Sequence, residues 1–309
     1  MSGIITTSSF AKSLWPGVNT WYGQAYAEYP VEWDKLFEKN TSRRAFEEDV
    51  GTSGLGLAVV KDQAGGITYD SMKQGFTSRY NHVTYGLGFI VTREAFDDDM
   101  YDVVAKKKAQ SLAFSMRQTK EIIGANVYNR AFNTNYLGGD GATLVACAAG
   151  GSASAPNVFG GTYTNGPSAA VDLSEAALEQ ACIDIAGFTT DRGLKIAVRP
   201  RKLIIPKELM FEADRILKTE GRTGTDLNDL NALKARGLIP EVVVNHYLTD
   251  TDAWFILTDV RDGLKYFERR GDEFTMDEDF DTENAKYKAT ARYSFGWTDR
   301  RGVYASPGV

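Results

Sequence analysis

The side chains that most often carry out chemistry in proteins are few in this sequence. The chain has two cysteines, Cys147 and Cys182, and two histidines, His82 and His246. Two cysteines are too few for a disulfide framework or a four-ligand zinc site, and the two histidines match no metal-ligand spacing. We therefore expect two reduced thiols, no metal site and no cofactor.

Three segments come near to known site motifs without matching them. Residues 51–56 are glycine-rich, but the glycines stand in the wrong order for a dinucleotide fingerprint. Residues 150–154 end in serine, where the turn around a hydrolase nucleophile requires glycine. Residues 277–281 alternate acids as a calcium loop does, but Thr282 and Lys288 replace the required glycine and glutamate. Because no nucleophile–base pair can be assembled, the sequence favours a protein that is not an enzyme.

The composition is that of an ordinary soluble globular protein. The 309 residues are 43% hydrophobic and 25% charged, which predicts roughly two domains or one elaborated domain. The 35 basic and 41 acidic residues give a net charge of −6, without the basic surplus that wide nucleic-acid binding needs. No run approaches the ~18 apolar residues of a membrane span, and the N-terminus does not read as a secretory signal. We therefore expect synthesis in the cytoplasm and no contact with a membrane.

Residues 98–132 give the strongest helical pattern. Apolar residues recur three, four or seven positions apart, and no proline occurs in the stretch. Acidic residues 97–99 stand where the dipole of the helix favours negative charge. Some 33 helical residues would extend roughly 50 Å, about three times the average helix, which suits a structural spine.

The N-terminal residues 1–30 are rich in aromatic side chains and carry only two charges. Pro16, Gly17 and Pro30 interrupt the segment, and the apolar positions have no clean period. Two interpretations remain open here. The aromatics pack into the core of their own domain, or the segment is an arm that lays them on another subunit. On the second interpretation the contact residues include Trp15, Trp21 and Tyr22.

Residues 43–91 predict a long β-rich excursion. The run Asp-Gln-Ala-Gly-Gly at 62–66 is a turn signal, and residues 83–91 alternate with a period of two. Two strands of this length joined at a turn are marginally stable alone in water. They need a supporting surface, from their own domain or from a neighbour.

The rest of the chain divides into three parts. Residues 133–171 form a glycine-rich, weakly charged loop region, and residues 286–297 alternate almost perfectly as one long, half-buried strand. Between them, residues 172–280 have the pattern of a compact α/β unit. In this unit we predict helices at 174–187, 208–219 and 227–236, and strands at 194–198, 203–206, 241–247, 254–258 and 264–269.

This order of elements, with its motifs, resembles the major capsid proteins of tailed double-stranded DNA phages, and within them the branch of Mu-like head subunits. The likeness covers about residues 30–305, and it rests on the order and spacing of several segments. They are WDKLF at 33–37 with Ser42 and Arg43-Arg44, YGLGF at 85–89, TREAFDDD at 92–99, Asp140-Gly141, Thr249-Asp250 with AWF at 253–255, and RYSFGW at 292–297 with Arg301-Gly302.

The resemblance implies the Hong Kong 97-type capsid fold, which is an α+β fold. Residues 1–39 would form an N-terminal arm and residues 40–92 an extended β-hairpin loop. Residues 93–171 and 281–309 would form a peripheral domain around the spine helix 98–132, and residues 172–280 an axial domain. The loop would then touch a neighbouring subunit through residues around its turn, namely Val59, Lys61, Gly65, Gly66, Ile67 and Tyr69.

By the same resemblance, the chain would assemble into hexamers and pentamers of the icosahedral head shell that encloses phage DNA. Its partners would be further copies of itself, a portal, a separate scaffolding protein, a decoration protein in some heads, and packaged DNA held without sequence specificity. We expect a shell without covalent links between subunits. The competing hypotheses are another virion protein, such as a tail-tube or decoration protein, and least of all an enzyme. A tube subunit would be mostly β and would lack the helix at 98–132.

Overall fold

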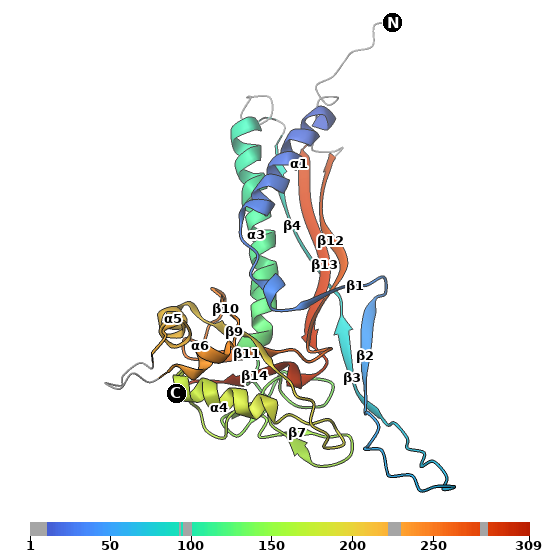
Figure 1. Ribbon diagram of the computed structural model, residues 1–309. Helices are drawn as coiled ribbons and strands as arrows, with labels where there is room; N and C mark the ends of the chain where they lie inside the picture. The colour runs from blue at the N-terminus through green and yellow to red at the C-terminus, as the bar shows by residue number, and fades with distance from the viewer. Residues whose placement is uncertain (1–10, 93, 95–100, 222–229, 279–283) are drawn as a thin grey trace, which may run out of the picture.

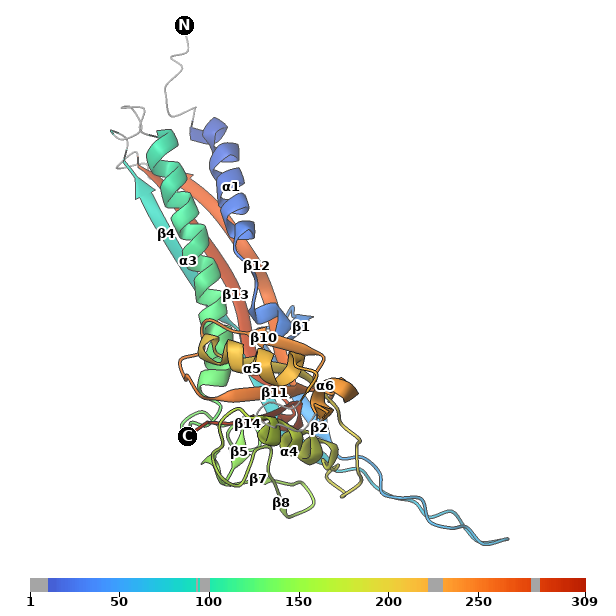
Figure 2. The same ribbon diagram turned by 60° about the vertical axis from the view of Figure 1, so that its left-hand side comes forward.

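The computed structural model describes residues 11–92, 94, 101–221, 230–278 and 284–309. A long four-stranded sheet forms one end of the molecule, with the strand order β1-β12-β13-β4. The strands are β1 (Glu38–Thr41), β12 (Leu264–Glu278), β13 (Ala285–Trp297) and β4 (Val83–Val91). The helices α1 (Ala11–Glu28) and α3 (Tyr101–Asn129) lie along the sheet (Figures 1 and 2). β1 runs parallel to β12, and the other neighbours are antiparallel.

The first hydrophobic core lies between this sheet and the spine helix α3. Along β13 the predicted apolar face is buried, from Tyr287 to Tyr293, while the lysines of the other face stay exposed. The apolar stripe of α3 meets it, with Ala105 and Ala109 fully buried and Leu112 4% exposed. The strand period of 2 residues and the helix period of 3.6 residues therefore identify the buried face of β13 and of α3. The predictions of a half-buried strand and of a long spine helix are confirmed.

The second unit is built on a four-stranded sheet with the order β10-β9-β11-β14. Its core contains Leu203, Trp254 and Ile256, which are completely buried. The strands are β9 (Pro200–Ile205), β10 (Glu241–Val244), β11 (Trp254–Thr258) and β14 (Val303–Ser306), and the helices are α4 (Glu175–Ala186), α5 (Met210–Lys218) and α6 (Ala232–Arg236). The hydroxyl of Ser174 caps α4 by accepting the N–H of Ala177.

Shorter elements lie within these two units and between them. They are the 3-10 helices η2 (Trp33–Lys35), η3 (Lys207–Leu209) and η4 (Arg300–Gly302), and the two-stranded pairs β5 (Ala146–Cys147) with β6 (Gly150–Gly151) and β7 (Ala155–Pro156) with β8 (Thr162–Tyr163). The strand pairings also link the ranges expected for separate domains, because β12 pairs with β13 in the long sheet and β14 pairs with β11 in the second unit. The peripheral and axial division stays a prediction.

The β-rich segment at residues 43–91 pairs its strands differently from the prediction. β2 (Phe46–Thr52) pairs with β3 (Gln74–Asn81), whereas the predicted second strand, β4, pairs with β13 in the long sheet. The chain changes sheets at His82, whose ring is hydrogen-bonded on both sides, to Ser42 at 3.1 Å and to Ser294 at 3.0 Å. The clear alternation at 83–91 led to the prediction of the second hairpin strand there, whereas β3, which ends one residue before β4, is the strand that pairs with β2.

One further expectation is wrong, because residues 194–198 form no strand. The helix expected at 227–236 is confirmed over Ala232–Arg236, where Asn231 caps it by accepting the N–H groups of Leu233 and Lys234. Residues 227–229 lie outside the described part. The N-terminal segment is a helix despite Pro16 and Gly17, and its Val18, Tyr22 and Ala25 are buried in the first core. Packing against α3 outweighs the poor intrinsic helix propensity. Within the described residues, no helix is both long and apolar enough to cross a membrane.

Candidate functional site

The most prominent surface feature is the outer part of the hairpin, residues 53–73. From here on we call these residues the arm; they are distinct from the N-terminal arm expected at residues 1–39. It extends away from both units (Figures 1 and 2). Large apolar side chains on it face solvent, with Leu57 80%, Val60 90% and Tyr69 91% exposed. Soluble monomers rarely present such a concentration of apolar surface unless it marks an interaction site.

The backbone of the arm is also largely unpaired. Among residues 54–72 one backbone–backbone hydrogen bond forms, from the N–H of Gly65 to the carbonyl of Asp62 at 3.0 Å. This bond closes the predicted turn, with Ala64 in the left-handed conformation at φ 66°. The two sides of the arm are therefore extended segments whose N–H and C=O groups lack a protein partner over most of their length.

Ser53 joins the two sides where the arm leaves β2 and β3. Its N–H donates to the carbonyl of Lys73 at 3.0 Å, and its hydroxyl accepts the N–H of Lys73 at 2.8 Å. Ser53 is completely buried. The root of the arm is thus closed by paired hydrogen bonds, although the outer part is not.

A clamp of charged groups holds the arm against the second unit. Asp70 accepts the N–H of Gly56 at 2.8 Å and pairs with Arg192 at 3.0 Å, and Arg192 also donates to the carbonyl of Ser71. The ring of Phe159 lies under the cations of both Lys73, at 4.6 Å, and Arg192, at 4.4 Å. The N–H of Gly56, more than the guanidinium of Arg192, lowers the pKa of Asp70, so the clamp carboxylate stays charged.

A second anchor fixes the strands of the hairpin to the long sheet. Asp49 on β2 pairs with Lys265 on β12, and it accepts the hydroxyl of Thr298 at 3.0 Å. Tyr80 on β3 shares a hydrogen bond of 2.6 Å with the same threonine. These contacts and the clamp set the direction in which the arm projects.

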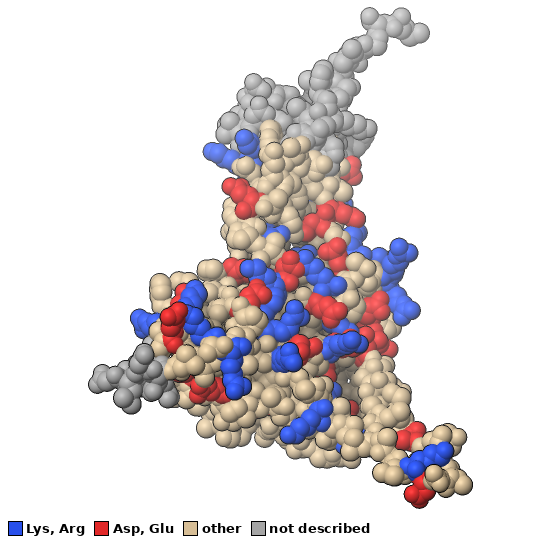
Figure 3. Space-filling model, viewed as in Figure 1, with Lys and Arg blue, Asp and Glu red and all other residues tan. Residues whose placement is uncertain are grey.

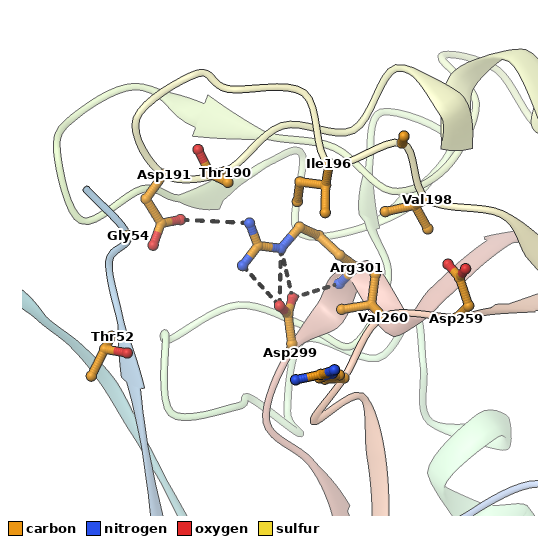
Figure 4. A pocket seen from close by; sticks show the side chains of 12 residues that line it. Thr52, Gly54, Thr190, Asp191, Ile196, Val198, Asp259, Val260, Asp299 and Arg301 are labelled. Carbon is orange, nitrogen blue, oxygen red and sulfur yellow. Dashed lines mark hydrogen bonds and ion pairs between the residues drawn. The ribbon is translucent and has the colours of Figure 1, made fainter. Parts of the chain in front are cut away.

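Between the root of the arm and the second unit lies a cavity of about 390 Å³. Figure 4 shows Arg301 inside it, paired with Asp299 at 2.8 Å and facing Asp191 at 3.9 Å. Both carboxylates face the guanidinium of Arg301, so these groups hold the walls of the cavity together and give the root of the hairpin structural support. Among the described residues, no group of three or more His, Cys, Asp or Glu side chains is placed to hold a metal ion.

The structure brings the predicted residues of the hairpin together. Val59 and Ile67 are 70% and 67% exposed, and Lys61, Gly65, Gly66 and Tyr69 are exposed beside them on the arm. Their contact with another subunit stays a prediction. No sequence pattern indicates the residues that hold the arm, which are Ser53, Asp70 and Arg192. Their partners are brought close only by the fold.

The predicted contact residues of the N-terminal segment that the structure describes pack against their own subunit. Tyr22 is only 5% exposed and stacks on Phe274 with ring centres 4.6 Å apart, so its assignment to an inter-subunit contact is wrong. Trp21 packs against the same core, with the ammonium of Lys106 5.6 Å from the centre of its ring. The side chain of Trp15 lies outside the described residues. The aromatic side chains of α1 contact both β12 and α3, and these contacts explain why α1 folds onto its own subunit.

A buried ion pair joins Asp140, in one of the segments that carry the resemblance, to Arg300, which directly precedes another. Arg300 and Asp140 are 2.7 Å apart, with side chains 9% and 12% exposed. Arg300 also donates to the carbonyl of Pro156 and lies 4.8 Å from the centre of the Tyr163 ring. The pair links the glycine-rich region 133–171 to the C-terminal segment.

The sequence model of the family described as phage capsid protein matches residues 75–306, about three quarters of the chain. The chain belongs to this family of phage capsid proteins. The expectation of a phage capsid protein is thereby confirmed, and the family is one of structural proteins. No curated protein matches the sequence.

Solved structures agree with this capsid protein in fold. A virus-like particle from Pyrococcus furiosus matches with a TM-score of 0.52 and 9% identity, over 94% of this chain and 98% of the other. Mycobacterium phage Patience matches with 0.52 and 11%, over 99% and 89%. Microbacterium phage Oxtober96 matches with 0.52 and 10%, over 90% and 91%. The Hong Kong 97-type α+β fold is confirmed, whereas the Mu-like branch stays a prediction.

Proposed function

We propose that this capsid protein assembles into hexamers and pentamers that close into the icosahedral head shell around phage double-stranded DNA. In such a shell the arm of each subunit lies over a neighbour. The observation that carries the proposal is the arm itself, because its exposed apolar side chains and unpaired backbone have no partner within the described subunit. A second copy supplies the missing surface at every position of a closed lattice.

The energy of such a contact is adequate for assembly. Burying one large aliphatic side chain contributes about 1.5–3 kcal/mol, and the arm presents several, among them Leu57, Val59 and Ile67. Part of this gain offsets the ordering of the arm and the loss of free rotation of the subunit. Each subunit both gives and receives an arm, so modest contacts add up around a ring.

The remaining partners follow from the place of a shell protein in the virion. They are a portal, a separate scaffolding protein, a decoration protein in some heads, and DNA held without sequence specificity. On the face seen in Figure 3, acidic and basic side chains are intermixed over the body of the subunit. The net charge of −6 also fits a container that holds DNA without adhering to it. The subunit would be made in the cytoplasm of the bacterial host and end in the virion.

Electron microscopy of the expressed chain tests the proposal. We expect closed shells from the natural sequence and at least tenfold fewer from Ile67→Asp, because losing about 1.4 kcal/mol weakens one contact tenfold and the loss recurs at every contact of the shell. The matched control is Gln63→Asp, which adds the same charge at an exposed polar position of the turn and should assemble normally. Lys61→Ala should also assemble, because an exposed ion pair is worth only ~0–1 kcal/mol. Open tubes, or a stable monomer at high concentration, would contradict the proposal.

A further inference from the structure

The outer edge of β4 is an unprotected strand edge. β4 stands last in the long sheet, and among the described residues no strand pairs with its other side, which lies along the margin of the sheet in Figure 2. The strand has nine residues and contains neither a charged residue nor a proline. Val83, Leu87 and Ile90 are each about half exposed, at 49%, 51% and 51%. An edge that is long, apolar and without such protection is a template for pairing with another chain.

The side chains of β4 alternate between large and small. Tyr85, Leu87 and Phe89 lie opposite Ala291, Ala289 and Tyr287 of β13, on the buried side of the sheet. Gly86 and Gly88 lie on the other side, close against β13, where a Cβ on Gly88 would stand 2.5 Å from the carbonyl oxygen of Tyr287. Glycines inside a strand often mark a place where another backbone approaches closely.

The arm carries the complementary pattern. Leu55, Leu57 and Val59 alternate with Gly56 and Ala58, so a strand formed here also has one large and one small side. If it were added beside β4, its leucines and valine would extend the side of Leu87. Its small residues would extend the side of the two glycines. The unpaired backbone groups of both segments would also find partners.

We propose that residues 55–59 of the arm add as a fifth strand to the free edge of β4 of a neighbouring subunit. The inference rests on the proposed shell and names the surface that receives the arm. The arm cannot reach β4 of its own subunit while Asp70 is clamped to Arg192, because the clamp directs it away from the long sheet (Figure 1). The occupant is therefore a second copy of this chain, and backbone pairing fixes the register together with the alternating side chains.

Disulfide trapping tests the proposal. In Leu57→Cys with Leu87→Cys, the two new thiols would lie on the same side of the joined sheet. Mild oxidation of assembled particles should give a ladder of multimers on a non-reducing gel, and reducing agent should collapse it. The native thiols Cys147 and Cys182 are buried, so they should not contribute. The control Leu57→Cys with Ile183→Cys carries an equally accessible thiol, 64% exposed on α4, and should give no ladder.

The outcomes separate this inference from the proposed function. Shells that show no cross-link in the first variant, or the same ladder in the control, would overturn the strand addition and leave the shell standing. Absence of shells from the natural sequence would overturn both. If the cysteine variant does not assemble, hydrogen exchange on natural shells decides. Amides of residues 84–90 should exchange at least tenfold more slowly in shells than in free subunits, and equal rates would overturn the proposal.

Discussion

Replacing Asp140 by asparagine would remove one charge of a buried ion pair while leaving the side chain almost unchanged in size. Its partner Arg300 would keep its charge, 9% exposed, with the carbonyl of Pro156 at 3.2 Å as its remaining strong acceptor. Breaking a buried pair in this way typically costs about 3–5 kcal/mol, because the surviving charge stays out of water. We expect about 3 kcal/mol, since the amide oxygen of asparagine still accepts a hydrogen bond.

A loss of this size is a large part of the ~5–15 kcal/mol that stabilises a typical domain. Urea unfolding of the unassembled subunit measures it, provided that the transition is two-state. The matched control is Asp214→Asn, which breaks a pair of the same length, 2.7 Å, between Lys218 and Asp214, with side chains 70% and 43% exposed. The control should lose no more than ~1 kcal/mol. Equal losses in the two variants would refute the reasoning that burial decides the value of the Asp140 pair.

Three further predictions concern the first core. Tyr22→Ala should cost about 3 kcal/mol, whereas Tyr22→Phe should be neutral or slightly stabilising in thermal melts, because the buried hydroxyl has no hydrogen-bond partner. Ile123→Asp should lower the melting temperature by several degrees, while Lys107→Glu on the exposed face of α3 should not change it. Burial, more than the nearby arginines, lowers the pKa of His82, so the unfolded chain binds its proton more readily. Stability should therefore fall as the pH drops below about 6.5, and His82→Gln should flatten this fall.

The sequence predicts the elements whose apolar period is long and uninterrupted. The strand at 285–297 and the spine helix follow their patterns closely, because each buries one face along its whole length. The family could also be identified, since the order of many weak motifs is more specific than any one of them. The turn at 62–66 was predicted from its cluster of turn residues, although its left-handed position is Ala64 and not one of the glycines.

The rest depends on contacts that a local pattern cannot contain. The helix α1 includes Pro16 and Gly17, and it forms because Tyr22 and its neighbours meet a surface supplied by residues far along the chain. The clamp between Asp70 and Arg192 joins two exposed loops that carry no motif. In β12, register shifts between Glu268 and Arg270 and again before Glu273 break the alternation, so the strand was predicted to end early.

Electron cryomicroscopy of particles formed by the expressed chain tests the central claim most directly. The account predicts closed shells in which the arm of each subunit, residues 53–73, is ordered against the adjacent subunit, with Leu57 and Ile67 buried at that contact. It also predicts that the Asp70–Arg192 clamp is kept in the assembled subunit. Shells held together by other surfaces, with the arm free in solvent or folded onto its own subunit, would contradict it.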